Sequence, residues 1–377
     1  MSNWSATSFV LLIVIGITAC EQSTTESAPP NAMAPVQIEL SGWQTYFQFN
    51  GVHEVRSISG DYTVNKVLED PVLRTGYGLI VDGQLMVMDA ANGDHFRLEG
   101  EVLLPDNKPS GDAYSFSSGD WAFTYTQSDG LFSACSELTK ECNYINVEKG
   151  TFPFVYAQAE GAVLTITNWG DAVKFDGRSW CRMTVIDDVW ACPTQHEPPV
   201  VEPRKQQFYS SVLYQGKTFL GHWPTGVLYH FDGKQLYPDQ RMTPGPIWEL
   251  REQNLGYEAQ SMSVYCGDLF VGYWPRGEVW RLDGQNSNWH AFARLFSHGS
   301  KDSFIPYMNR EPDDLEGAFF GQRVTTLVPH ADSLYAFTGN LNSWTRSVQN
   351  PSWLTEEQIR EYGTIWRIHR PGCETKY

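Results

Sequence analysis

Short apolar runs separated by turns rich in Gly, Pro and Asp recur along this chain, and two neighbouring segments repeat the pattern closely. Residues 214–236 and 265–288 share Tyr-x-Gly, an apolar run, Gly-x-Trp-Pro-x-Gly, a second apolar run and Asp-Gly. The equivalent tryptophans, Trp223 and Trp274, lie 51 residues apart. Repetition at that spacing is typical of folds built from stacked copies of one small unit.

The apolar runs are too short for helices and predict β-strands. In the two copies, residues 218–221 and 269–272 form one strand, and residues 227–231 and 279–282 form the next. Trp-Pro-x-Gly separates these strands, because Pro has no backbone donor for the ladder and Gly permits positive φ. Asp-Gly after the later strand favours a tight hairpin turn.

Weaker forms of the same pattern extend through the rest of the chain. Three of them predict further strands, in residues 79–100, 120–147 and 162–180. Residues 324–340 predict another hairpin and residues 364–369 a final strand.

The two ends of this region have their own signals. Residues 41–67 are expected to donate the strand that closes a ring beside the C-terminus. Residues 355–362 predict a short helix, with Thr355 and Gln358 at the spacing of a capping box.

These elements predict an all-β fold. A lone four-stranded sheet cannot bury both faces, so copies must stack, and about four to eight such blades close a propeller. We expect a β-propeller of seven four-stranded blades over residues 39–377, a length that suits one large β domain. A β-sandwich containing two similar hairpins is the alternative.

The N-terminus resembles an export signal. Residues 9–19 are mostly apolar and too short to span a bilayer. They end in Ile-Thr-Ala before Cys20, which resembles a bacterial lipobox and implies cleavage and lipidation at Cys20. Residues 1–20 are then a lipoprotein signal peptide and residues 21–38 a flexible tether. The expected location is the bacterial outer membrane, facing the periplasm or the cell surface; a plain secretory signal is the alternative.

Six cysteines follow Cys20, and an exported chain can oxidise them. Two pairs flank short segments and favour local disulfides, which leaves a third pair by elimination. The predicted pairs are Cys135 with Cys142, Cys181 with Cys192, and Cys266 with Cys373. Zinc ligation is the alternative, although no C-x-x-C spacing supports it. No cofactor is expected, and a structural calcium or zinc ion stays open.

The composition limits the partners. A formal charge of −17 argues against nucleic acid, which needs a basic footprint. Fourteen Trp and eighteen Tyr exceed what a core requires, and aromatic rings also stack on sugars. An acidic polysaccharide remains compatible, because a few local cations can outweigh distant surface charge. We expect a monomer that contacts the membrane through its lipid anchor only.

A propeller binds at the end of its central channel, where the inner strands start and where the turn after the next strand lies. Two repeat positions lead there: the residue before Trp-Pro and the start of the inner strand. Asn168, His222, Tyr273 and Thr338 occupy the first, while Gln206, Tyr209, Tyr257, Gln260 and Arg323 occupy the second. Arg276 lies in the adjoining Trp-Pro-Arg-Gly turn. Structural roles are the alternative: hydrogen bonding between blades for His222, rim packing for Tyr257 and Tyr273, and a solvated turn for Arg276.

His, Tyr and Arg together suit β-elimination from a uronic acid. Arg pairs with the carboxylate and so acidifies the α-proton. A neutral His or a tyrosinate takes that proton, and a Tyr protonates the leaving oxygen. Hydrolysis by paired carboxylates is the competing chemistry; Asp171 lies near the rim but has no identified partner.

The Gly-x-Trp-Pro-x-Gly blades, the export signal and the rim His and Tyr resemble the ulvan lyases built as seven-bladed propellers. The resemblance implies an exported polysaccharide lyase acting on a sulfated, uronate-containing glycan, with His222 and Tyr257 as catalytic residues. The position expected to hold the Arg holds Tyr273, so the carboxylate would pair with Arg276 or Arg204. Asn168 and Arg323 would complete the substrate-binding set. A non-catalytic glycan-binding or assembly propeller is the alternative function.

Overall fold

The structure is a computed structural model. It describes residues 62–69, 73, 75–90, 92–106, 114–193, 206–253, 256–297, 319–342 and 349–373. The expected signal peptide and tether, the lipidation site Cys20 and the candidate Arg204 lie outside the described residues.

Six antiparallel sheets make up the described part of the chain. The first three in chain order have four strands each. The first sheet contains β2 (Gly76–Val81), β3 (Gln84–Asp89), β4 (His95–Glu99) and β5 (Val102–Asp106). The second contains β6 (Tyr114–Ser118), β7 (Trp121–Thr126), β8 (Leu131–Ser136) and β9 (Cys142–Asn146). The third contains β10 (Pro153–Ala159), β11 (Ala162–Thr167), β12 (Ala172–Phe175) and β13 (Trp180–Arg182).

The fourth sheet has six strands, because the Cys181–Cys192 segment folds as a hairpin that joins its outer edge. It contains β14 (Thr184–Ile186), β15 (Val189–Ala191), β16 (Gln207–Tyr214), β17 (Lys217–Trp223), β18 (Leu228–Phe231) and β19 (Gln235–Pro238). The fifth contains β20 (Glu258–Tyr265), β21 (Asp268–Trp274), β22 (Glu278–Leu282) and β23 (Trp289–Arg294). The sixth contains β24 (Arg323–His330), β25 (Ser333–Gly339), β26 (Thr364–His369) and β1 (Thr63–Glu69).

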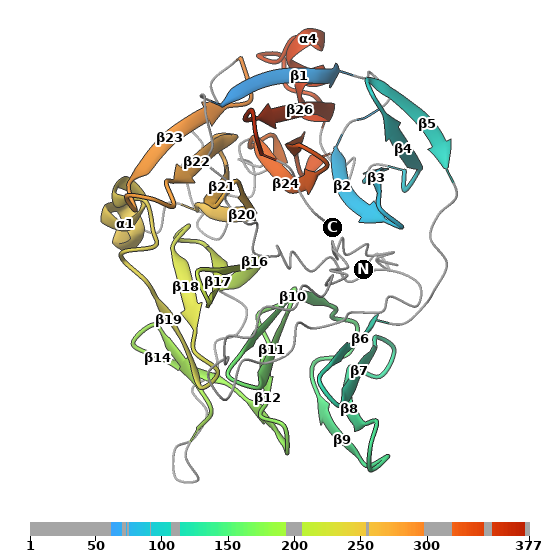
Figure 1. Cartoon of the computed structure of the whole chain (residues 1–377), viewed down its shortest axis with the longest axis vertical. Coiled ribbons are helices and arrows are strands. Elements are labelled where there is room, and N and C mark those ends of the chain that lie inside the picture. The colour runs from blue at the N-terminus through green and yellow to red at the C-terminus, as the bar shows by residue number, and fades with distance from the viewer. Residues whose placement is uncertain are drawn as a thin grey trace.

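These sheets surround a common centre in chain order, and the innermost strands are β2, β6, β10, β16, β20 and β24 (Figure 1). Small hydroxyl side chains join the inner strands: Ser210 Oγ donates to the Ala259 carbonyl at 2.9 Å, and Ser261 Oγ to the Val324 carbonyl at 2.8 Å. Apolar clusters fill the spaces between neighbouring sheets. The chain is therefore an all-β propeller, as the repeat predicted. The described residues form six sheets, so the predicted number of seven is not confirmed.

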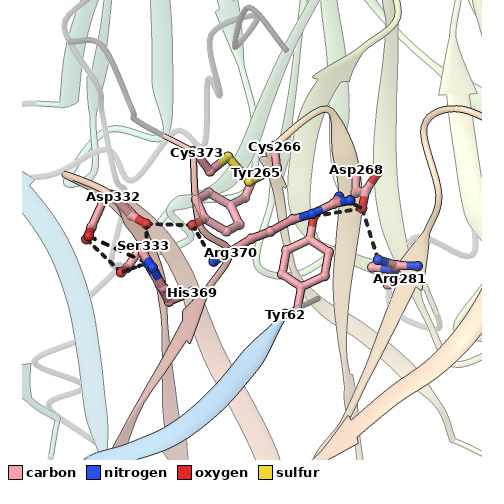
Figure 2. Close-up of a disulfide and its surroundings, with 10 residues drawn as sticks. All are labelled: Tyr62, Tyr265, Cys266, Asp268, Arg281, Asp332, Ser333, His369, Arg370 and Cys373. Atoms are coloured by element: carbon pink, nitrogen blue, oxygen red, sulfur yellow. Dashed lines mark hydrogen bonds and ion pairs between the residues drawn. A yellow bond between two sulfur atoms is a disulfide. The ribbon is translucent and has the colours of Figure 1, made fainter. Parts of the chain in front are cut away.

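The ring is closed by strands from both ends of the described chain. β1 pairs antiparallel with β26, with Thr63 opposite His369, which confirms the predicted closing strand. Nearby, Cys266 and Cys373 form a disulfide (Figure 2). Beside it, Tyr62 Oη donates to Asp268 Oδ2 at 2.7 Å. The closure thus combines a strand pair, a covalent bond and a buried carboxylate.

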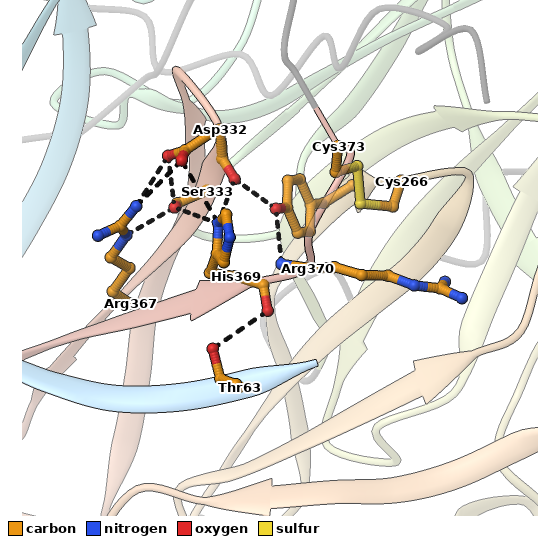
Figure 3. Close-up of polar contacts among 9 residues, drawn as sticks. Thr63, Cys266, Asp332, Ser333, Arg367, His369, Arg370 and Cys373 are labelled. Carbon is orange, nitrogen blue, oxygen red and sulfur yellow. Dashed lines mark hydrogen bonds and ion pairs between the residues drawn. A yellow bond between two sulfur atoms is a disulfide. The ribbon is translucent and has the colours of Figure 1, made fainter. Parts of the chain in front are cut away.

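A second polar group supports the closure on the other side of the disulfide. Arg367 donates to the Asp332 carboxylate at 2.9 Å, and Tyr265 Oη donates to the Asp332 carbonyl at 2.6 Å (Figure 3). His369 also contacts that carbonyl through Nδ1 at 3.0 Å. The end of β26 is therefore held to the turns of two blades.

Of the remaining sequence predictions, those for the disulfides and the capped helix are confirmed, and one helix was missed. All three predicted disulfides are present, and Thr355 and Gln358 form the predicted capping box of α4 (Glu356–Arg360). The prediction was wrong in missing α1 (Gly245–Leu250), which starts at a Gly-Pro pair. Two short 3-10 turns, η2 (Arg251–Gln253) and η4 (Glu361–Gly363), follow the helices. Within the described ranges, neither helix has the length and apolar character to cross a bilayer.

Candidate functional site

The inner strands and the turns of neighbouring blades meet at one end of the ring, which we call the hub end. Here the turn after the second strand of one blade contacts the start of the next blade's inner strand. Three successive contacts join Asn168 with Gln207, Thr225 with Tyr257, and Arg276 with Gln322. The two sets of repeat positions chosen from the sequence therefore do lie at the same end of the ring.

Three consecutive blades place polar residues at the first position of the inner strand. Gln207, Glu258 and Arg323 begin β16, β20 and β24, opposite the last residues of the adjoining strands. Arg323 Nη2 lies 2.9 Å from Glu258 Oε1, and the two residues are 3% and 2% exposed. We call this buried ion pair the hub pair.

The hub pair is enclosed by polar and aromatic groups. Arg323 Nη1 donates to Gln260 Oε1 at 2.6 Å, and the guanidinium carbon lies 5.4 Å from the Trp274 ring centroid. It also lies 6.0 Å from the ring of Tyr209, which is partly exposed. These contacts position the guanidinium between two aromatic faces, where a cation is favoured.

Two atoms of the hub pair have no hydrogen-bond partner among the described residues. They are Glu258 Oε2 and Arg323 Nε, an acceptor and a donor. Burial raises the pKa of Glu258, although Arg323 acts in the opposite direction. Burial, with Glu258 adding to it, also raises the pKa of Tyr209, whose hydroxyl donates to Gln207 Oε1 at 2.6 Å.

His222 does not point into the hub. It is 1% exposed and packs against Phe208 and Tyr229, with ring centroids 4.9 and 4.8 Å away. Its Nδ1 contacts Thr225 Oγ1 at 2.8 Å, within its own turn, and Nε2 has no partner among the described residues. The expectation that this position faces a substrate was wrong for the side chain, because both faces of β17 pack against neighbouring blades and all its residues from Thr218 to Trp223 are buried.

Tyr257 and Tyr273 lie together, as predicted, but both are buried. A Cβ on Gly226 would meet both side chains, and both belong to the cluster between the fourth and fifth sheets. His222 packs instead on residues of the cluster between the third and fourth sheets. The structure therefore does not gather His222 and Tyr257 around one space. Burial raises the pKa of Tyr257, while nearby Arg276 lowers it.

The remaining predicted residues lie at the rim of the hub end. The Arg276 side chain is 42% exposed and lies 3.8 Å from Glu278. The Asn168 side chain accepts a hydrogen bond from the Phe152 backbone at 2.9 Å, and its neighbour Trp169 is 43% exposed. Arg323 differs from these residues, because it is buried at the hub as a member of the hub pair. Among the described residues at the rim, Arg276 and Trp169 thus present a cation and a large aromatic ring to solvent.

Sequence reasoning missed Glu258, although a signal was present. Glu258 follows Gln207 by 51 residues, the same spacing that relates the two tryptophans of the repeat. Applying that spacing to the start of the inner strand would have placed Glu258 at the hub-end position that Gln207 holds in the preceding blade. In the described ranges, no group of three or more His, Cys, Asp or Glu side chains is arranged to hold a metal ion.

Comparisons with known proteins add little beyond this geometry. No family model and no curated protein match the chain. Solved structures that resemble it include the extracellular domain of a putative one-component system from B. thetaiotaomicron, at 8% identity over 77% of this chain with a TM-score of 0.36. The chain spans 32% of the length of that protein.

Two further structures are similar at the same level. One is a protein of unknown function from Bacteroides thetaiotaomicron, at 8% identity, a TM-score of 0.38 and coverage of 82% of this chain and 76% of that one. The other is BamB from Moraxella catarrhalis, at 10% identity, a TM-score of 0.28 and coverage of 81% and 98%. At these values the resemblances carry no functional argument, and the site must be interpreted from its own residues.

Proposed function

We propose that this chain is an exported β-propeller that binds an acidic, uronate-containing polysaccharide at the hub end. The observation that carries the proposal is that turns at the hub end carry the partly exposed side chains of Arg276 and Trp169, at the same end of the ring as the buried hub pair. Three disulfides support export, because oxidising compartments are where such bonds persist. The proposal includes a lipid anchor at Cys20 and no nucleic-acid partner.

The residues at the rim suit such a ligand. A guanidinium can form two parallel hydrogen bonds with one carboxylate, which favours a uronate over a neutral sugar. Trp169 offers a flat apolar face for the C–H side of a sugar ring. The chain's charge of −17 opposes binding of a polyanion only weakly, since physiological salt screens exposed charges that lie more than roughly 8 Å from the ligand.

The more specific form of the proposal is an ulvan-type lyase. In that reaction a base removes the proton next to the uronate carboxylate, the bond to the leaving oxygen breaks, and a carbon–carbon double bond forms. Tyr257 would be the acid that protonates the leaving oxygen, but burial raises its pKa, which weakens it as an acid, and the residue is only 3% exposed. The burial of His222 leaves it no access to substrate, so the non-catalytic binding form has the stronger support.

Binding is tested by titrating the folded chain with a uronate polysaccharide. Arg276→Ala should weaken binding about tenfold, because a charge-assisted pair with the carboxylate is lost. Arg178→Ala is the matched control, since Arg178 is an exposed arginine on the β12–β13 turn at the opposite end of the blades. Equal affinity for the acidic polymer in both variants and the wild type would contradict the proposed site.

Lyase activity is tested by the ultraviolet absorbance of the unsaturated sugar that elimination leaves. Tyr257→Phe removes only the hydroxyl and keeps the ring against Gly226, so a lyase should lose its product while keeping its fold. Binding without any absorbing product in the wild type would restrict the function to recognition. Product formation unchanged in both Tyr257→Phe and His222→Phe would remove these residues from the mechanism.

A further inference from the structure

We infer that the hub pair, Glu258 and Arg323, is the specificity-determining contact that recognises a hydroxyl group of the sugar ring. This inference rests on the proposed function and extends it from the rim to the centre of the ring. Arg276 at the rim would bind the carboxylate of a uronate, while the hub pair forms hydrogen bonds with a hydroxyl group of the same sugar.

The first observation is that, among the described residues, Arg323 and the nearby Tyr209 hydroxyl do not use the full hydrogen-bonding capacity of the hub pair. Glu258 Oε1 accepts from Arg323 at 2.9 Å, whereas Oε2 and Arg323 Nε have no partner among the described residues. Leaving buried polar atoms unpaired is unfavourable, and most of all for charged groups. A pair with a purely structural role would be expected to satisfy both oxygens.

Two other buried carboxylates in the same ring show that contrast. Asp171 accepts from Arg182 through Oδ1 at 2.5 Å and from the Glu148 backbone through Oδ2 at 3.3 Å. Asp268 likewise uses both oxygens, one for the Gly284 backbone and the other for Tyr62. The fold can therefore satisfy buried carboxylates fully, and Glu258 departs from that pattern at the hub.

The chemistry of the two unpartnered atoms selects the ligand. Glu258 Oε2 accepts a hydrogen bond and Arg323 Nε donates one, while the ion pair as a whole is neutral. A cation would satisfy only the carboxylate and would be repelled by the guanidinium, and an anion would meet the reverse problem. A hydroxyl group donates through its O–H and accepts on its oxygen, so it satisfies both atoms without adding charge.

The surroundings connect the hub pair to the rim. Tyr209 and Gln207 are the partly exposed members of this cluster, so a ligand approaches the pair over them. Arg276 forms a backbone bridge with Gln322, the residue before Arg323. In the inferred complex, one uronate places its carboxylate at the rim arginine and a ring hydroxyl at the hub pair, with the Tyr209 ring beside its C–H face.

The test uses the full chain with its disulfides intact and two polymers: a uronate polysaccharide and the same polymer with its carboxyl groups reduced to alcohols. Glu258→Gln keeps the shape of the side chain but removes its charge. We expect it to weaken binding of both polymers about tenfold or more, because both keep the ring hydroxyls. Arg276→Ala should weaken binding of the acidic polymer alone.

Controls separate recognition from folding. Asp268→Asn perturbs a fully partnered buried carboxylate at the end of β21 that lies away from the hub, and it should leave both affinities unchanged. If Glu258→Gln lowers the melting temperature too far for binding measurements, Tyr209→Ala replaces it, because Tyr209 is partly exposed and its loss leaves the ion pair in place. Tyr209→Ala should also weaken binding of both polymers.

Two results would overturn the inference in distinguishable ways. If the wild type binds the acidic polymer and a folded Glu258→Gln chain, or Tyr209→Ala in its place, binds it equally well, the hub pair is not the recognition element and the proposed function stands. If the wild type binds neither polymer, the proposed function fails and the inference fails with it.

Discussion

At the scale of single residues, burial decides the charge state of the ionisable groups that the repeat places near the hub. His222 is enclosed by aromatic rings, and burial lowers its pKa to about 3. Tyr273 is 0% exposed, and burial raises its pKa. Both side chains are therefore neutral at physiological pH, His222 as free imidazole and Tyr273 as phenol.

The low pKa of His222 predicts a pH dependence of stability. Unfolded histidine takes up a proton below about 6.5, whereas the folded chain resists protonation until about 3. Between those values the unfolded state binds more protons, so this histidine lowers stability as the pH falls. His222→Phe keeps an aromatic ring beside Phe208 and should remove that contribution, roughly 1.4 kcal/mol per pH unit within the window.

The measurement is the free energy of unfolding by denaturant for wild type and variant at pH 7, 5 and 4. Carboxylates elsewhere affect both chains equally and cancel in the difference. The variant should gain relative to the wild type as the pH falls. A constant difference across that range would show that His222 titrates normally and is not enclosed as described.

At the scale of elements, the glycine of Gly-x-Trp-Pro-x-Gly has a packing reason. A Cβ on Gly272, in β21, would lie 2.5 Å from Ser261 Oγ and 2.6 Å from Val324 Cβ of the next blade. The equivalent Gly221 would meet Ala259 of the following inner strand. The first glycine of the motif therefore leaves space for the adjacent blade to approach closely. In the sequence this requirement is visible only as a repeated glycine.

Gly272→Ala should destabilise the chain by about 1–3 kcal/mol, because the added methyl group overpacks the contact between two blades. Gly245→Ala is the matched control. Gly245 begins α1, and nothing lies within 4 Å of a Cβ at that position. The control should be neutral or more stable by about 0.5–1 kcal/mol in denaturant unfolding. Equal stability of the two variants would contradict the packing at the blade contact.

At the scale of the whole molecule, closure joins segments that are far apart in the chain. Cys266 and Cys373 are separated by 107 residues, whereas Cys135 and Cys142 are separated by seven. Tyr62 reaches Asp268 across 206 residues. These long connections hold the final blade and the first described strand to the fifth blade.

Removing the long-range disulfide should cost more stability than removing the local one. A cross-link that closes a loop of about 100 residues restricts the unfolded chain by roughly 4.7 kcal/mol in the chain-entropy treatment, and a loop of about 15 residues by roughly 3 kcal/mol. Cys266→Ala with Cys373→Ala should therefore lower the melting temperature more than Cys135→Ala with Cys142→Ala. A larger loss in the local pair would show that closure does not depend on this bond.

The sequence predicted the end of the ring at which the candidate site lies, but not which side chains face it. The repeat located the hub end correctly, because the starts of inner strands and the intervening turns recur at one spacing. It selected His222 and Tyr273, whose side chains lie on strand ends that are buried on both faces by neighbouring blades. Irregular register near Tyr209 and Gln260 further altered which residues face the hub.

The sequence by itself determined the repeated blade with its strands, the two local disulfides and the capped helix, because each depends on nearby residues or on a spacing visible in the chain; the Cys266–Cys373 pair followed only by elimination. Only the tertiary structure decided that His222 lies in the core and that Glu258 meets Arg323. That pair joins residues 65 positions apart, and its burial follows from how neighbouring blades pack around the hub. Local patterns fix which elements form, whereas contacts between blades fix which side chains are enclosed and which remain within reach of a ligand.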